Sequence, residues 1–344
     1  MELPMPTIKR LLLAVSMCCL IATANAAPLD DAEAAYQRGD YAQALKILRP
    51  LATQGDAAAQ HNLGFMYASG QGITQDYKEA VKWFRLAAAQ GDAKAQSNLG
   101  FMYASGQGAT QNYKEAVKWY RLAAEQGYAS AQYNLGFMYA SGQGITQDYK
   151  EAVEWFRLAA EQGYAAAQYN LGFMYASGKG ILQDYQETLK WYRLAAAQGN
   201  AEAQNNIGLM YHNGQGVTQD YQEALKWFRL AAAQGHALAQ NNIGGMYVAG
   251  QGFAKNYQEA LKWFRLAAAQ GNSEAQNSIG GMYYSGLGVT KNHQEALRWF
   301  RLAAAQGYAD AIENLKLPNM IAAAQNSTPD RRSTSIKTGT QKEE

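Results

Sequence analysis

Residues 62–91 read NLGFMYASGQGITQDYKEAVKWFRLAAAQG, and the chain writes this stretch again, with small changes, every 36 residues. Tryptophan occurs only at this interval, as Trp83, Trp119, Trp155, Trp191, Trp227, Trp263 and Trp299. A fixed period between about 20 and 50 residues is typical of proteins built from stacked structural repeats. The sequence therefore predicts seven repeats over residues 57–307.

Each unit has the pattern of two helices joined by a glycine-rich turn. Apolar residues at helical spacing over 57–69 predict a first helix that is capped by Gly70. Asp76, followed by Glu79, predicts a capping box at the start of the second helix. Gly64 lies inside the first helix, where glycine costs about 1 kcal/mol relative to alanine. We therefore expect two helices to approach closely at Gly64 and at its copies.

One helix pair cannot bury its own apolar face, so neighbouring pairs are expected to stack. The tryptophan column shares the phase of the alanines in the second helix, and we interpret it as a bulky anchor between repeats. Arg85 and its copies do not change along the chain. We interpret them as structural, with the stem covering apolar surface and the charge facing the carboxyl end of the helix.

The pattern A-x-x-x-L-G-x-x-Y, then G-x-G, then D-Y-x-x-A-x-x-W-F-R-x-A-A-x-x-G resembles the Sel1-like repeat, a 36-residue relative of the tetratricopeptide repeat. The resemblance implies an all-α fold, a right-handed superhelical solenoid of antiparallel helix pairs. It also implies a role as an adaptor or scaffold that binds other proteins. Residues 27–56 resemble one degenerate unit, and residues 308–325 are predicted to form a C-terminal capping helix.

The two ends of the chain are predicted to be separate from the repeats. Lys9 and Arg10 precede an apolar run and the small-residue sequence Ala24-Asn25-Ala26, which is typical of a cleaved signal peptide over residues 1–26. Both cysteines lie in that segment, so the mature chain would have no thiol. The apolar run lies there too, and we expect no membrane span in the mature chain. Residues 326–344, rich in serine, threonine and charge, are predicted to be disordered.

Composition disfavours several classes of function. Without residues 1–26 the chain has 28 basic and 27 acidic side chains, which is not the basic balance of a nucleic-acid-binding protein. The four histidines fall at four different repeat positions, and no metal-ligand spacing or catalytic motif is present. We therefore expect neither a metal, nor a cofactor, nor an enzymatic activity.

The copies differ at four positions of the first helix, those of residues 58, 61, 65 and 68, and these share one helical face. In the tetratricopeptide pattern this face lines the concave groove. Neutral drift on a solvent-exposed face is the alternative, but aromatic side chains on such a face are typical of interaction sites. The aromatic candidates for partner binding are Phe65, Phe101, Phe137, Phe173, Tyr133 and Tyr169.

A column of asparagines runs beside that face, comprising Asn62, Asn98, Asn134 and Asn170 in the first four repeats. Their amides could pair with the backbone of an extended peptide, whatever its sequence. They could equally form hydrogen bonds between repeats, and the sequence leaves both interpretations open.

These features predict a non-enzymatic exported scaffold, bacterial and periplasmic or secreted, that holds a protein or peptide partner in the groove. The alternatives are an envelope enzyme and an assembly factor associated with polysaccharide or peptidoglycan. The sequence has no convergent acid, base or metal residues to support the enzyme, whereas a glycan could stack on the aromatic positions. Neither nucleic acid nor a membrane is an expected partner.

We predict that the exported protein begins at Ala27, because the charged start, the apolar run and the Ala-Asn-Ala sequence together specify cleavage after Ala26. N-terminal sequencing of the protein recovered from the cell envelope or medium checks this. An N-terminus at Met1, or protein found only in the cytosol, would contradict it.

Overall fold

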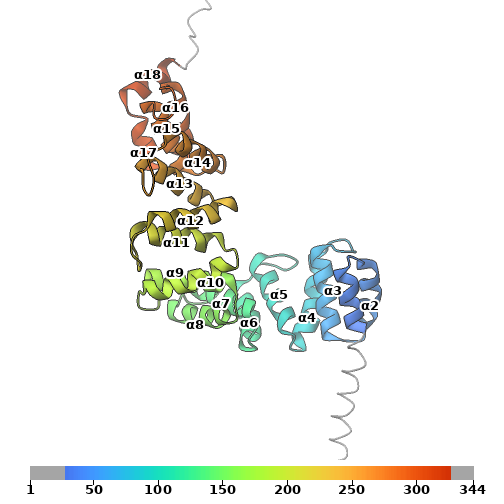
Figure 1. Ribbon diagram of the computed structural model, residues 1–344. Helices are drawn as coiled ribbons and strands as arrows, with labels where there is room; N and C mark the ends of the chain where they lie inside the picture. The colour runs from blue at the N-terminus through green and yellow to red at the C-terminus, as the bar shows by residue number, and fades with distance from the viewer. Residues whose placement is uncertain (1–27, 327–344) are drawn as a thin grey trace, which may run out of the picture. The chain divides into compact units, whose positions relative to one another are not determined.

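A computed structural model of the chain describes residues 28–326, and every regular element in that range is a helix (Figure 1). The helices belong to two compact units that divide after Gln183. The predicted signal peptide at 1–26 and the predicted disordered tail lie outside the described residues, except that Asn326 ends the last helix.

The first unit begins with a helical stretch at 28–37 and continues through helices of almost constant length. These are α2 (Tyr41–Thr53), α3 (Ala57–Ser69), α4 (Tyr77–Ala89), α5 (Ala93–Ser105), α6 (Tyr113–Glu125), α7 (Ala129–Ser141), α8 (Tyr149–Glu161) and α9 (Ala165–Ser177). The second unit contains α10 (Tyr185–Ala197), α11 (Ala201–Asn213), α12 (Tyr221–Ala233), α13 (Ala237–Ala249), α14 (Tyr257–Ala269), α15 (Ser273–Ser285), α16 (His293–Ala304), α17 (Ala309–Asn314) and α18 (Pro318–Asn326).

Within each unit, the first and second helices of a repeat pack on each other and on the next repeat, which confirms an all-α solenoid of helix pairs. The first helix spans Ala57–Ser69, as predicted, and it ends with Gly70 in the left-handed conformation (φ 73°) that is typical of a helix end.

The capping box predicted at Asp76 forms only in part. Asp76 Oδ1 accepts hydrogen bonds from the backbone N–H groups of Lys78 (2.9 Å) and Glu79 (3.1 Å), as predicted. However, the N–H of Asp76 donates to the carbonyl of Tyr67 in the first helix (2.9 Å), so the Glu79 carboxylate does not receive it. Glu79 instead pairs with Lys82, one turn further along α4.

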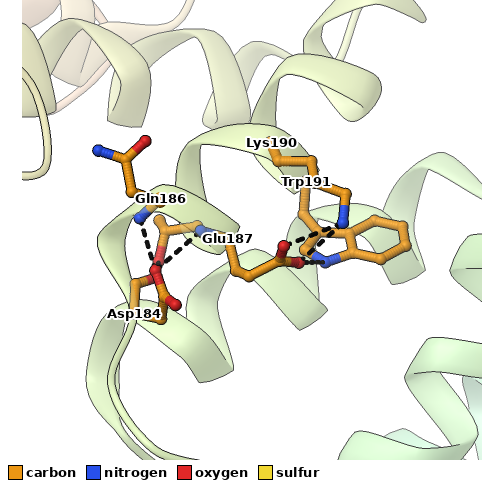
Figure 2. Close-up of polar contacts among 6 residues, drawn as sticks. Asp184, Gln186, Glu187, Lys190 and Trp191 are labelled. Atoms are coloured by element: carbon orange, nitrogen blue, oxygen red, sulfur yellow. Dashed lines mark hydrogen bonds and ion pairs between the residues drawn. The ribbon is translucent and has the colours of Figure 1, made fainter.

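Figure 2 shows the same arrangement in the second unit, where the glutamate has one more partner. Asp184 Oδ1 caps α10 by accepting from the N–H groups of Gln186 (2.8 Å) and Glu187 (3.0 Å). The Glu187 carboxylate accepts from Lys190 Nζ (3.0 Å) and from Trp191 Nε1 (3.0 Å). The glutamate column therefore organises side chains along the second helix in addition to lying in its first turn.

The close approach expected at Gly64 is confirmed, and it involves an aromatic ring. A Cβ atom on Gly64 would lie 2.8 Å from ring atom Cδ1 of Phe84 in the second helix of the same repeat. A Cβ essentially never comes that close to a ring carbon, so the two helices can meet here only at a glycine. The same contact recurs between Gly100 and Tyr120, Gly136 and Phe156, Gly208 and Phe228, Gly244 and Phe264, and Gly280 and Phe300.

Tryptophan packs across the boundary between repeats, which is the anchoring role expected. Trp119, for example, packs against the buried cluster that contains Val81 and Phe84 of the preceding repeat. Most of the tryptophans are half-buried, and Trp191 alone is buried, with 8% of its surface exposed. The column is therefore structural, but its members are not equally protected from solvent.

A buried glutamine column joins consecutive repeats. Gln96 Nε2 donates to the carbonyl of Ala88, at the end of the preceding repeat's second helix (3.2 Å), and Gln96 Oε1 accepts from Gln126 Nε2 (2.7 Å). Other buried members of the column make both bonds, namely Gln60, Gln132, Gln204, Gln240 and Gln276. The sequence shows that these glutamines recur without change, but it does not show which groups they form hydrogen bonds with.

The arginine column is structural, as interpreted, but through a different contact from the one expected. Arg121 Nη2 donates to the phenol of Tyr139 in the next repeat (2.9 Å). The same bond joins Arg85 to Tyr103, Arg193 to Tyr211, Arg229 to Tyr247, and Arg265 to Tyr283.

Arg157 departs from this pattern. Its Nη2 lies 4.0 Å from Glu154, which occupies a position held by lysine in the other full repeats of the first unit. Its Nε has no hydrogen-bond partner, and Tyr175 in the next repeat is buried without the arginine contact. The column therefore lacks one bond, in the one repeat that carries glutamate at the position of Glu154.

The C-terminal end contains two helices where residues 308–325 predicted one. α17 ends at Asn314, and α18 begins at Pro318, because proline is well suited to the first turn of a helix. Met320 of α18 is fully buried against Leu297 and Phe300 of α16. α18 thus covers the apolar face that the last repeat leaves without a neighbour.

We expect Trp191→Ala to lower the free energy of unfolding by about 3–5 kcal/mol, the range for truncating a buried aromatic side chain. Denaturant unfolding followed by circular dichroism measures the loss. Trp119→Ala is the matched comparison and should cost less, because Trp119 is half-buried and its Nε1 has no hydrogen-bond partner. A loss below about 1 kcal/mol for Trp191→Ala would mean that the anchor is not needed.

We expect Tyr139→Phe to lower the free energy of unfolding by about 0.5–1.5 kcal/mol, because the change removes the acceptor of the Arg121 bond and little else. Tyr175→Phe is the control within the same chain and should have little effect, since no arginine donates to Tyr175. Equal losses in the two variants would show that the arginine bond contributes nothing to stability.

Candidate functional site

Four phenylalanines of the first helices are exposed, and all of them lie in the first unit. The exposed fraction is 44% for Phe65, 49% for Phe101, 47% for Phe137 and 43% for Phe173. They occupy the same position of α3, α5, α7 and α9, so each repeat presents one ring to solvent. Exposed aromatic side chains that recur on one face are typical of an interaction surface.

The outer two rings have neighbours that partly cover them. Phe65 meets the ring of Tyr36 edge-on, with centroids 6.4 Å apart. Lys179 Nζ lies 5.8 Å from the ring centroid of Phe173. Of the four rings, Phe101 and Phe137 are therefore the best positions for testing the face by substitution.

A cavity of about 600 Å³ lies at the beginning of this face, between the helical stretch 28–37 and α3. It brings together Asn62 and Phe65, two of the residues predicted to bind a partner, and adds Tyr36, His61 and Tyr128. Its charged lining residues are Asp30, Glu33, Asp92 and Lys94. Its volume lies within the range of roughly 300–1,000 Å³ that is typical of ligand pockets.

His61 contributes to this cavity mainly as a neutral ring. Burial lowers the pKa of its imidazole, and the nearby Asp92 carboxylate only partly opposes this. A ring with a lowered pKa is uncharged at pH 7. The net charge of the cavity wall is therefore negative.

Tyr133 and Tyr169 are half-buried rather than freely exposed. The ring of Tyr133 lies 5.2 Å from that of Tyr164 and 5.9 Å from that of Phe156, centroid to centroid. Burial raises the pKa of the Tyr133 phenol, with a smaller contribution from Tyr164. Tyr133 thus packs on other aromatic rings of its own repeat and presents only part of its surface to a partner.

The asparagines of the candidate site make contacts between and within repeats. Asn98 Nδ2 lies 3.0 Å from His61 Nε2 of the preceding repeat, and Asn170 forms a hydrogen bond to the Tyr133 phenol. Asn62 Oδ1 lies 3.1 Å from Nδ1 of its neighbour His61, and Asn134 is half-buried. Asn98 and Asn170 therefore support the interpretation that the column links repeats.

The corresponding face of the second unit is polar and partly hollow. Glycine replaces phenylalanine at Gly245 and Gly281, and a Cβ at either would meet no atom within 4 Å. Asn205 and Asn241, at the position of His61, are buried. The two units thus present different chemistry at equivalent positions.

A second exposed column was not singled out in the sequence. Leucines of the second helices are exposed in every repeat, namely Leu86, Leu122, Leu158, Leu194, Leu230, Leu266 and Leu302. The leucine is the same in every copy, as the buried residues are. A comparison between copies therefore could not show that it is exposed.

No helix between residues 28 and 326 is both long and apolar enough to span a membrane. Over the same residues, no group of three or more histidine, cysteine, aspartate or glutamate side chains could hold a metal ion.

Two solved structures from bacteria share this architecture. One is the crystal structure of c5321, "a protective antigen present in uropathogenic Escherichia coli strains displaying an SLR fold", with 38% identity and a TM-score of 0.72 over 83% of this chain. The match spans 64% of that antigen's length. The other is a Sel1 repeat protein from Oxalobacter formigenes, with 35% identity and a TM-score of 0.66 over 71% of this chain and 96% of that one.

Comparison with curated proteins gives no match. The model of the Sel1 repeat family, in contrast, matches seven consecutive segments: 57–92, 93–128, 129–164, 165–200, 201–236, 237–272 and 273–308. These segments cover most of the chain and coincide with the helix pairs described above. The chain therefore belongs to the Sel1 repeat family.

Proposed function

We propose that this protein is an exported, non-enzymatic scaffold that binds a partner protein along the exposed face of its first helices. The observation that carries the proposal is the exposure of Phe65, Phe101, Phe137 and Phe173, one in each of four consecutive repeats. Large aromatic side chains are seldom kept in solvent on a regular face without a contact to make. The fold itself needs none of the four rings, because a leucine or a glycine occupies their position in the other repeats.

The partner that suits this face is an extended protein segment with apolar side chains. Rings spaced by one repeat would contact side chains at intervals along it, since packed helices lie about 8–10 Å apart and an extended chain rises about 3.3 Å per residue. The cavity beside Phe65 would receive one end of such a segment, and its acidic wall favours a positively charged group there. Binding should therefore depend more on the first unit than on the second.

Export is part of the proposal and rests on the N-terminal sequence and on the bacterial relatives. The charged start and apolar run of residues 1–26 support secretion across a membrane. Both solved relatives come from bacteria, which is consistent with a periplasmic or secreted location.

We expect the double variant Phe101→Ala, Phe137→Ala to bind its partner at least tenfold more weakly. Truncating a central interface aromatic often costs about 2 kcal/mol, and about 1.4 kcal/mol corresponds to tenfold. The partner is first isolated from cell-envelope extract on the immobilised protein, and its affinity for the variant is then measured by calorimetry. Helical content measured by circular dichroism should not change, because both rings lie outside the core.

The double variant Leu122→Ala, Leu158→Ala is the matched control, because it removes exposed apolar side chains from the second helices of the same two repeats. It should leave partner affinity unchanged. Unaltered binding by the phenylalanine variant would place the partner elsewhere, and weaker binding by the leucine variant alone would place it on the second helices. A loss of helicity in the phenylalanine variant would mean that these rings support the fold.

A further inference from the structure

The cavity beside Phe65 is formed by the helical stretch 28–37 and the two first helices that follow it. The stretch 28–37 provides one side, α3 provides the middle, and the beginning of α5 provides the other side. α3 lies between the other two, because Phe65 meets the ring of Tyr36 and His61 contacts Asn98 of α5. The cavity therefore spans the beginning of the first-helix face.

Most of the cavity wall is accessible to a ligand. Its exposed charged side chains are Asp30, Glu33 and Lys94, and its exposed or half-buried rings include Tyr36, Phe65 and Tyr128. The buried residues of the lining are Ala32, Leu48 and Met66. A ligand can therefore contact the charged groups and the rings without displacing residues of the core.

The two sides of the cavity carry opposite charge. Asp30 and Glu33 lie three residues apart on the stretch 28–37, so their carboxylates share one face of that helix. Lys94 lies on the other side, in the first turn of α5. Among the described residues, none of these three charges forms an ion pair. Asp92 is also acidic, but its Oδ1 already caps the N-terminus of α5. A cation is therefore favoured beside Asp30 and Glu33.

Aromatic rings line the cavity next to the two carboxylates. Tyr36 lies three residues after Glu33 on the same helix, and its ring meets Phe65 edge-on with centroids 6.4 Å apart. The Tyr36 hydroxyl donates to Gln71, so Tyr36 offers its ring to the cavity. A ring attracts a cation that lies within about 6 Å of its centroid, and it also packs on apolar groups. This side of the cavity thus suits an ammonium group that has an apolar side chain beside it.

The amino terminus of a polypeptide segment has this combination. It is positively charged at pH 7, because its usual pKa is about 8, and its first side chain lies next to the amine. A carboxyl terminus is negatively charged, so Asp30 and Glu33 would repel it. The cavity also lies where one end of a segment is expected, because 28–37 is the first helical stretch of the described residues.

We propose that this cavity binds the free amino terminus of the partner segment. The amine pairs with Asp30 and Glu33, and the first side chain packs on the rings of Tyr36 and Phe65. The backbone then crosses α3 toward Lys94. The inference rests on the proposed function, in that the first-helix face is taken to bind a protein segment. It adds the direction of that segment, whose amino end lies at the stretch 28–37.

The test compares two peptides that differ only at the amino end. Both have the sequence Leu-Ser-Leu-Ser-Gly with a neutral dye at the carboxyl end, and one of them is acetylated. Fluorescence anisotropy with the purified protein at low salt should show the free peptide binding at least about fivefold more tightly, because acetylation removes the charge and two hydrogen-bond donors. Equal affinity for the two peptides, or no binding of the free peptide, would overturn the proposal.

A third peptide distinguishes an amino terminus from a lysine side chain. Acetyl-Lys-Ser-Leu-Ser-Gly with the same dye should bind more weakly than the free leucine peptide, because its ammonium group reaches the carboxylates only in place of an apolar side chain on the rings. If it binds as tightly as the free leucine peptide, the cavity recognises a lysine side chain and the assigned direction is wrong.

Three variants locate the binding. Glu33→Gln should at least halve the preference for the free peptide, whereas Asp31→Asn should retain it, because Asp31 is exposed on the same helix but does not line the cavity. Ala58→Leu should weaken binding of the free peptide about threefold or more, because the larger side chain narrows the cavity. It should fold normally, since Leu238 occupies the same position in another repeat. Equal effects of Glu33→Gln and Asp31→Asn would overturn the assignment to this cavity.

The double variant Phe101→Ala, Phe137→Ala separates this inference from the proposed function. Neither ring lines the cavity, so the variant should retain the preference for the free peptide even where it no longer binds the partner. Loss of the preference would show that the peptide binds at the phenylalanines, and the cavity assignment would fail. Partner binding that the variant leaves unaltered would contradict the proposed function alone.

Discussion

The contact between a mid-helix glycine and an aromatic ring is the constraint on which the rest of this fold depends. At Gly64 and its copies, the backbone of the first helix lies directly against the ring of Phe84 or its equivalent. That approach brings Leu63 and Met66 into the core and fixes which face of the first helix is buried. On the other side of the helix the position of Phe65 is exposed, so its residue can differ between repeats without loss of the fold. The candidate binding face contains that position.

Polar side chains then set the register between repeats. The glutamine column satisfies the carbonyls at the ends of the second helices, and the arginine–tyrosine column joins the same neighbours nearer the surface. Apolar packing is non-directional and would tolerate small shifts, whereas a buried amide that must meet both a donor and an acceptor does not. Arg157 shows how local this register is, because it lacks the tyrosine bond while Arg121 and Arg193 in the adjacent repeats keep theirs.

Periodicity and simple sterics were enough to predict the helix pairs, the left-handed cap at Gly70 and the close approach at Gly64, since each depends on residues within one unit. Which partner a given group contacts was less predictable. The capping box at Asp76 is incomplete because a carbonyl of the neighbouring helix takes its N–H, and α18 exists because an uncovered apolar face remains to be packed. The exposed phenylalanines could be predicted from variation between copies. The missing tyrosine bond of Arg157 could not, because it depends on how side chains of two repeats meet.

The bonds between repeats have a consequence for how such a chain can change in length. They join residues at fixed separations of 8 and 18 positions, and the same residue types recur at each. If recombination between two copies of the coding sequence deleted or added one 36-residue repeat, the buried glutamine at the new junction would meet the same kind of acceptor that it had before. The order of groove residues, in contrast, would shift by one repeat. A single genetic event can thus change the order of groove residues and leave the frame unchanged.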